Sequence, residues 1–295
     1  MMFKPQSAEF RTIGGQSLKV HLVSTGAVTV KTKFRDASTT GLLAKIAFML
    51  DRKYTGWLPI WVMIIEHPEG IFVIDTGENS NISDRDYFNF ASPMVKWFNT
   101  TQYKFTVERE EEIDRQLQPL RIPVEKISSV ILTHLHLDHV DGLRHFTNTP
   151  VLVNKAEWEK PFGDLPQLYP PGFKPHLVEL NEQYEMFDKA FYITNAKDIV
   201  LVETPGHTWH HCSVIIKTER SHILFGADVC YDQQQVIDKK YSGANASHKL
   251  AKDTYAKLRT YCWDNPVIFI PSHEAAAADR LRESRYIKVK SAPRG

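Results

Sequence analysis

Three histidines and an aspartate lie within six positions directly after a short apolar run, and no other feature constrains the chain as strongly. The run Val130–Leu132 has the length and branched side chains of a buried strand, and it is followed by His134, His136, Asp138 and His139. Side chains two positions apart at a strand end point the same way, so His134 and His136 can face one centre. Asp138 and His139 come after the strand has ended and can turn toward a second centre. Imidazole and carboxylate groups are ligands that zinc and similar divalent ions favour.

Four ligands cannot complete two metal sites, and three further candidates occupy the same kind of position downstream. Each stands in a tight turn directly after another apolar run, namely His207 in Thr-Pro-Gly-His, Asp228 in Gly-Ala-Asp and His273 in Pro-Ser-His. Taken singly, each is equally well explained as a turn or capping residue. As a set with the first cluster, they predict a metal site at one edge of a sheet.

The rest of the chain alternates between short apolar runs and helix-like stretches. The runs of strand length are Leu18–Val23, Val62–Ile65, Ile71–Ile74, Val130–Leu132, Val151–Val153, Ile199–Val202, Ser213–Ile216, Ile223–Phe225 and Val267–Ile270. An acidic first turn predicts a helix over Val107–Leu117, and apolar residues at helical spacing predict another over Ala246–Thr260. This alternation favours a layered α/β architecture over an all-β sandwich.

Two regions interrupt the alternation, one near residues 33–59 and the other near residues 85–105. The first contains the apolar helical stretch Gly41–Leu50, and the second is rich in phenylalanine, tyrosine and tryptophan. Long excursions from a compact domain are often lids or binding loops. A helix that simply packs on the core explains each of them equally well, so both interpretations stay open.

Composition excludes several classes of function. The 295 residues carry 36 basic and 35 acidic side chains, and this near-neutral balance predicts no nucleic-acid partner. The longest apolar stretches are too short or too interrupted to span a bilayer, so we expect no membrane partner. Three cysteines without a Cys-x-x-Cys pair, Cys212, Cys230 and Cys262, are typical of a reducing compartment. The first residues contain no apolar signal segment, so we expect a cytoplasmic protein.

The ordered series of motifs resembles the metallo-β-lactamase superfamily. The resemblance rests on His-x-His-x-Asp-His, a Thr-Pro-Gly-His-Thr turn, a Gly-Ala-Asp aspartate and a final histidine, together with an early Asp75-Thr76-Gly77 turn. It therefore covers residues 75 to 273, which is most of the chain. It implies an αββα sandwich of two similar halves in one domain, residues 1–295, with two divalent metal ions at one edge.

The same resemblance assigns roles to the candidate ligands. His134, His136 and His207 would bind the first metal, and Asp138, His139 and His273 the second, while Asp228 would bridge both together with a water or hydroxide. Asp138 could also pass a proton to the leaving group. Such a donor set suits zinc, and it also suits iron, cobalt or manganese. The resemblance further suggests that His211 supports the site from behind, and Glu274 could orient an imidazole or be solvated.

Departures within the superfamily narrow the choice of reaction. His136 stands where di-iron members carry glutamate, and Asp228 is absent from true β-lactamases. The segment after His273 is too short for the helical domain of glyoxalase II. Asp228-Val229-Cys230-Tyr231 is similar to N-acyl-homoserine lactonases, in which a tyrosine three residues after the bridging aspartate contacts the substrate carbonyl. A phenol can donate a hydrogen bond to developing oxyanion charge, although Tyr231 taken alone would be an ordinary core residue.

We therefore expect a hydrolase that opens the lactone ring of acyl-homoserine lactones by attack of a metal-bound hydroxide. The fatty tail of this small-molecule substrate needs an apolar groove, which Leu42–Leu50 and Tyr87–Phe98 could supply. Two alternatives stay open, namely a related hydrolase of aryl esters, phosphotriesters or sulfate esters, and a metal-binding protein without turnover. Members of the family are often dimers, and the apolar excursions could serve a homodimer instead of a substrate.

Overall fold

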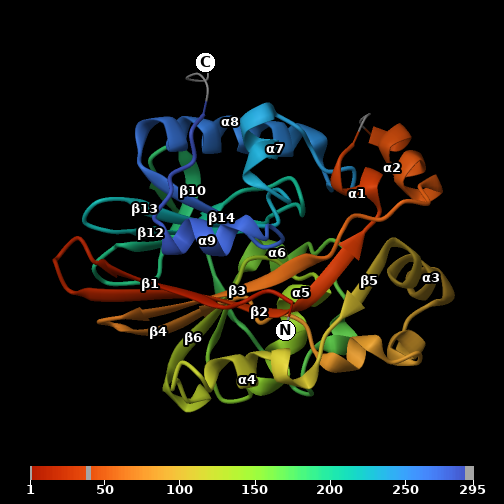
Figure 1. Ribbon diagram of the computed structural model, residues 1–295, viewed down its shortest axis with the longest axis horizontal. Helices are drawn as coiled ribbons and strands as arrows, with labels where there is room; N and C mark the ends of the chain where they lie inside the picture. The colour runs from red at the N-terminus through yellow and green to blue at the C-terminus, as the bar shows by residue number, and fades with distance from the viewer. Residues whose placement is uncertain (1, 38–40, 290–295) are drawn as a thin grey trace.

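Two β-sheets pack face to face, and helices cover the outer side of each sheet (Figure 1). The computed structural model describes residues 2–37 and 41–289. The first sheet has the strand order β1 (Gln6–Arg11), β2 (Ser17–Val30), β3 (Leu58–His67), β4 (Gly70–Ile74), β6 (Ile127–Leu132), β7 (Val151–Asn154) and β8 (His176–Val178), and β5 (Tyr103–Thr106) pairs with β2. The second has the order β14 (Val267–Pro271), β13 (His222–Ala227), β12 (Cys212–Lys217), β11 (Ile199–Glu203), β10 (Phe187–Tyr192) and β9 (Glu182–Tyr184).

The helices complete the four layers. In Figure 1, α7 (Gln233–Asp238) and α8 (His248–Asp264) lie along the top, and α4 (Ile113–Leu117) lies along the bottom. Two elements, α2 (Gly41–Leu50) and α3 (Pro93–Gln102), project together at one side. The remaining helices are α1 (Thr32–Arg35), α5 (Leu137–Val140), α6 (Lys155–Glu159) and α9 (Ala276–Arg282). This arrangement confirms the αββα sandwich that the resemblance implies.

Alternation along the strands explains the layers. On β2, Leu18, Val20 and Leu22 point into the core between the sheets, where they meet residues of the second sheet such as Leu201 and Val214. On the opposite face, Val23 belongs to the core beneath α4 and α5. A third core lies between the second sheet and α8. Each fully buried aliphatic side chain contributes about 1.5–3 kcal/mol, so burial on both faces of both sheets holds the strands rigidly in place.

Parallel pairing brings the ends of several strands to one edge. Strand β4 pairs with β6 in parallel and β13 pairs with β14 in parallel, whereas the other pairs in the second sheet are antiparallel. The carboxyl ends of parallel neighbours meet at the same edge of a sheet. The turns after β6, β13 and β14 lie at this edge and hold six of the seven candidate ligands. The seventh, His207, follows β11, which runs in the same direction as β13 because both are antiparallel to β12.

The apolar runs are confirmed as strands, but one predicted helix is wrong. All nine runs fall within strands, and the helix expected over Ala246–Thr260 corresponds to α8. Val107–Leu117 instead forms a 3-10 turn at Arg109–Glu111 followed by the short α4, because Glu112 adopts an extended conformation between them. Of the first excursion, residues 38–40 lie outside the described residues. In the described ranges, no helix has the length and apolar character needed to cross a membrane.

Candidate metal centre

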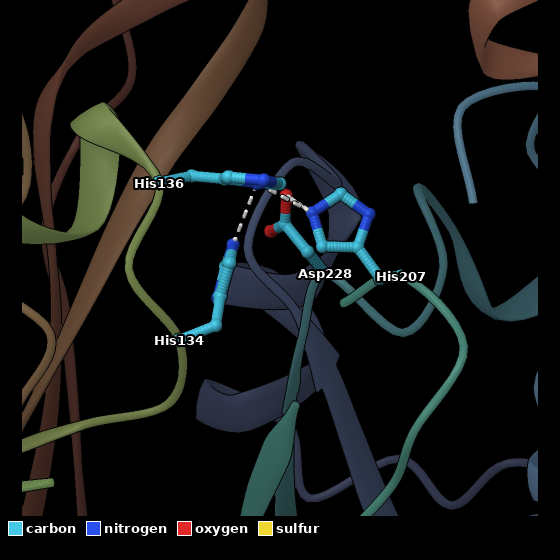
Figure 2. A group of neighbouring side chains, drawn as sticks. All are labelled: His134, His136, His207 and Asp228. Atoms are coloured by element: carbon cyan, nitrogen blue, oxygen red, sulfur yellow. Dashed lines mark hydrogen bonds and ion pairs between the residues drawn. The ribbon is translucent and has the colours of Figure 1, made fainter. Parts of the chain in front are cut away.

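Three imidazoles and a carboxylate from three separate turns converge on one point (Figure 2). The donor atoms of His134, His136, His207 and Asp228 all lie within 4.8 Å of one another. The Nδ1 atom of His136 lies 3.1 Å from Nε2 of His134 and 2.8 Å from Nε2 of His207. The turns after β6, β11 and β13 thus supply a histidine-rich group of the kind that binds a divalent metal.

A second group lies on the other side of the same carboxylate. It consists of Asp138, His139 and His273, with donor atoms again within 4.8 Å of one another. One oxygen of Asp228, Oδ1, lies 3.3 Å from Nε2 of both His139 and His273, and its other oxygen, Oδ2, lies 3.4 Å from Nε2 of His207. The structure therefore brings all seven sequence-predicted ligands together and sets Asp228 between the two groups.

Hydrogen bonds fix the outer nitrogen of several imidazoles. Nδ1 of His139 contacts Oδ2 of Asp75 at 2.7 Å, Nδ1 of His273 contacts the Pro59 carbonyl at 2.8 Å, and Nε2 of His136 contacts the Phe162 carbonyl at 2.8 Å. Each bond leaves the opposite ring nitrogen facing the centre. Such outer partners set the tautomer and the orientation of metal-binding histidines.

The electrostatics of the two groups fit divalent cations. Burial lowers the pKa of His134, His136 and His207, which leaves these imidazoles neutral, the form that binds metal. Burial also disfavours the charged form of His139, but the negative charges of Asp75 and Asp228 outweigh burial and raise the pKa of this imidazole. The group formed by Asp138, His139 and His273 therefore attracts positive charge. Nε2 of His139 and Oδ1 of Asp228 are buried and lack a hydrogen bond among the described residues. Bound metal ions would satisfy both atoms.

The ligand groups open into a cavity of about 450 Å³. Tyr231 lines this cavity beside the second ligand group, and the centroids of the Tyr231 and His273 rings are 5.6 Å apart. Burial raises the pKa of the Tyr231 phenol well above its ordinary value, and the charge of Asp228 raises it further, so the hydroxyl stays protonated. The phenol is therefore available as a hydrogen-bond donor at the end of the cavity that holds Asp138 and Asp228.

The remaining cavity wall is mostly apolar. Both excursions contribute to it, the first through Phe48 and Met49 and the second through Met94, Trp97 and Phe98. The excursions also contribute Phe34, Tyr103 and Phe105, whereas sequence reasoning missed Val28, Val30, Phe162 and Leu165. A signal for the last two was present in Pro-Phe-Gly-Asp-Leu, because Gly163 has a φ of +79° and a side chain there would meet His136 at 2.9 Å.

Two neighbouring residues take up distinct positions. His211 lies behind the centre, where its Nε2 accepts a hydrogen bond from the backbone amide of Asp228 at 3.2 Å. Among the described residues, no hydrogen bond or ion pair joins the Glu274 carboxylate to an imidazole. This carboxylate instead pairs with the buried Arg280 and accepts from the Gln233 amide at 3.1 Å. Of the two possibilities for Glu274, orientation of an imidazole and solvation, neither describes the structure.

Curated relatives share much of the chain. A protein named N-acyl homoserine lactonase from Bacillus sp. is 26% identical over 215 residues, which cover 72% of this chain and 80% of the relative. The N-acyl homoserine lactonase AttM of Rhizobium radiobacter is 23% identical over 231 residues, which cover 75% of this chain and 83% of the relative.

Solved structures show the same fold at lower identity. An N-acyl homoserine lactone hydrolase with N-hexanoyl-L-homoserine bound at its catalytic metal centre has a TM-score of 0.71 at 21% identity, covering 91% of this chain and 98% of its own. The dizinc quorum-quenching lactonase AidC has a TM-score of 0.59 at 15% identity, covering 92% of this chain and 91% of its own. The family model of the metallo-beta-lactamase superfamily matches residues 55–273, and the chain belongs to this superfamily.

Proposed function

We propose that this protein is a hydrolase that opens the lactone ring of N-acyl-homoserine lactones. The proposal rests mainly on one cavity, which Asp138, Asp228 and Tyr231 line together with three of the candidate imidazoles, and whose remaining wall is mostly aromatic and aliphatic. A lactone ring has a carbonyl for the polar end and a fatty tail for the apolar wall. The names of the similar lactonases support the same assignment.

The ligand groups would hold two divalent metal ions, for which we propose zinc. His134, His136 and His207 would bind one ion, Asp138, His139 and His273 the other, and Asp228 both. When bound, such ions polarise a carbonyl and lower the pKa of a coordinated water toward about 7. The Asp228 carboxylate faces both groups and would keep them at a fixed separation.

The chain's own residues would then act on the ester. The Tyr231 phenol donates a hydrogen bond to the lactone carbonyl oxygen, on which negative charge grows as water adds to the carbonyl carbon. The ring C–O bond breaks, and Asp138 passes the proton from that water to the leaving alkoxide. Asp138 is suited to this task because it lines the cavity and is held 3.4 Å from Nε2 of His273.

The fatty tail would lie along the apolar wall. Phe48 and Phe98 pack edge to face at 6.4 Å between ring centroids, and Phe34 packs against both Phe48 and Tyr103. We propose that residues 33–59 and 85–105 act as lid-like walls around this tail within a single metallo-hydrolase domain. Ligand pockets of ~300–1,000 Å³ with mostly apolar walls and few polar groups are typical of small-molecule sites.

The proposed setting is a reducing cytoplasm with no membrane or nucleic-acid partner. The reducing environment is supported by the three cysteines, Cys212, Cys230 and Cys262, which are all buried free thiols. We further propose a homodimer, supported by the apolar side chains that α2 and α3 expose, such as Leu42 at 73% and Met94 at 76%.

A comparison of substrates separates this proposal from other hydrolases with the same fold. We would measure kcat/KM for an acyl-homoserine lactone, an aryl ester, a phosphotriester and a sulfate ester under one set of conditions. The proposal predicts that the lactone exceeds the other three by several orders of magnitude. A higher value for any of the other esters would reassign the site to that substrate, and bound metal without activity on any ester would indicate a protein without turnover.

A further inference from the structure

A buried carboxylate outside the ligand set holds the loop that follows His207. Glu157 on α6 is 1% exposed, and its Oε2 atom accepts hydrogen bonds from Thr208 Oγ1 at 2.9 Å and from the His210 backbone amide at 3.2 Å. Thr208 is the residue directly after His207. The carboxylate therefore restrains the backbone at the point from which a candidate ligand projects.

The residue that caps the N-terminus of α6 binds the same loop a second time. Asn154, which caps this helix by accepting from the Ala156 amide at 3.1 Å, donates its Nδ2 to the His210 carbonyl at 3.1 Å. Both polar backbone groups of His210 are thus held by α6. Because α6 follows β7 of the first sheet and the loop joins β11 to β12 of the second, this contact crosses between the two halves of the protein.

The carboxylate also acts on the other turn of the histidine-rich group. Burial raises the pKa of Glu157 to about 7, against the opposing effects of the Thr208 hydroxyl and of the His210 and Leu135 backbone amides. Leu135 lies between His134 and His136. One side chain is therefore linked to both turns that supply the three imidazoles, which come from different sheets.

The Glu157 carboxylate has no cationic side chain paired with it among the described residues, and its Oε1 atom lacks a hydrogen bond there. A buried carboxylate without a paired cation lowers the stability of the fold, because its desolvation is not compensated. We therefore expect Glu157 to have a role that offsets this loss of stability. A cation in the neighbouring histidine-rich group would offset the desolvation of the carboxylate by electrostatic attraction. The hydrogen bonds that Glu157 accepts would at the same time orient the turns that carry the ligands.

We propose that Glu157 is a positioning residue, which fixes the His207 turn against the His134–His136 turn so that the three imidazoles converge. The proposal rests on the metal centre of the proposed function and adds a residue that touches neither metal nor substrate. Residues behind metal ligands typically contribute ~10- to 100-fold to metal affinity. We expect Glu157 to act on the histidine-rich site and to leave the Asp138–His139–His273 site nearly unchanged.

Zinc binding tests this without any substrate. Metal-free protein would be titrated with zinc in competition with a chromophoric chelator, and the binding step lost in His207→Ala would identify the histidine-rich site. Glu157→Ala should weaken that step by roughly 10-fold or more and leave the other step within about 3-fold. Glu157→Gln keeps an acceptor oxygen for Thr208 and should recover most of the affinity. Glu159→Ala, an exposed acid on the same helix, is the matched control and should bind like the wild type.

Several outcomes would overturn the proposal. Equal weakening of both steps in Glu157→Ala would indicate general destabilisation, and unchanged affinity would show that the turn needs no support. A Gln variant as weak as the Ala variant would also contradict positioning by hydrogen bonds. If Glu157→Ala fails to fold by circular dichroism, Thr208→Val decides, because it removes one hydrogen bond and must weaken the same step. A wild-type protein that binds no zinc would instead reject the metal centre itself.

Discussion

The Nδ1 atom of His139 lies 2.7 Å from the Oδ2 atom of Asp75, and both side chains are almost completely buried. Asp75 follows β4 with a φ of +62°, a left-handed conformation that aspartate and asparagine tolerate better than most residues. Its Oδ1 atom accepts from the Thr133 amide at 2.8 Å. One residue outside the ligand set therefore joins β4 to the turn after β6 and orients an imidazole.

Asp75→Asn should weaken metal binding without disrupting the backbone. Asparagine tolerates the same φ and can still accept from Thr133, but an amide NH₂ cannot accept from His139. We expect metal affinity at the Asp138–His139–His273 site to fall by roughly 10- to 100-fold, measured by zinc retention against a chelator. Asp84→Asn, an exposed position, serves as the control. Wild-type zinc retention in Asp75→Asn would show that this contact does not support the metal site.

Tyr231→Phe should lower kcat more than it raises KM. The substitution removes a hydrogen-bond donor that we place on the developing oxyanion and changes little of the buried ring. Loss of one such donor costs roughly 100-fold in kcat. Steady-state kinetics on an acyl-homoserine lactone would measure the change, with metal content determined in parallel. Wild-type kcat in a variant with full metal content would make Tyr231 an ordinary wall residue.

The length of the acyl chain should affect the rate. If the tail lies against the wall formed by Phe48, Phe98 and their neighbours, kcat/KM rises with acyl length by up to about fourfold per added methylene until the cavity is filled. Phe98→Ala should flatten the rise, whereas Trp263→Ala, an exposed position on α8, should leave it unchanged. Activity that is indifferent to acyl length would contradict the tail site.

Glu112→Gln should destabilise the fold at neutral pH. Glu112 is buried and accepts from Ser80 Oγ at 2.6 Å and from His145, and it pairs with Arg144. Burial raises its pKa, but these partners outweigh burial and lower it from 4.5 to about 2. The ionised carboxylate therefore stabilises the fold above pH 4.5, and this contribution is lost as the pH falls from about 4.5 toward 2.

The expected loss in Glu112→Gln at pH 7 is about 3 kcal/mol, the scale for breaking a buried ion pair. Urea unfolding of the variant and the wild type at pH 7 and at pH 3 would measure it, and the difference between them should shrink at the lower pH. Glu110→Gln is the exposed control in the same segment. A difference that stays constant or grows with acidity would refute the assigned role of Glu112.

The sequence was most informative where strands are buried on both faces. All nine runs are strands, and all but Leu18–Val23 and Ser213–Ile216 consist of apolar residues alone, as strands buried on both faces do. The missed strands are β1, β5, β8, β9 and β10. All of them carry mixed side chains, and all but β10 lie at a sheet edge or within an excursion. Half-exposed strands leave no apolar run to detect.

The ligand positions were also visible in the sequence, because every candidate follows a strand of one of the two sheets. The residues that hold these ligands in place were not visible in the sequence. Pairs such as Asp75 with His139 and Glu157 with Thr208 join residues 64 and 51 positions apart. The first contact depends on the pairing of β4 with β6 and the second on the packing of one half against the other, so no local pattern indicates either of them. The break at Glu112 was missed for the same reason, since its partners Ser80 and Arg144 lie 32 residues away on either side.

Ring opening of an acyl-homoserine lactone is the direct measure of the proposed activity. The purified protein would be incubated with a long-chain and a short-chain acyl-homoserine lactone, and proton release would be followed before chelation, after chelation and after zinc is added back. We expect rapid opening that chelation abolishes and zinc restores, with faster turnover of the long-chain substrate. No opening of either lactone by protein shown to hold two metal ions would contradict the proposed activity.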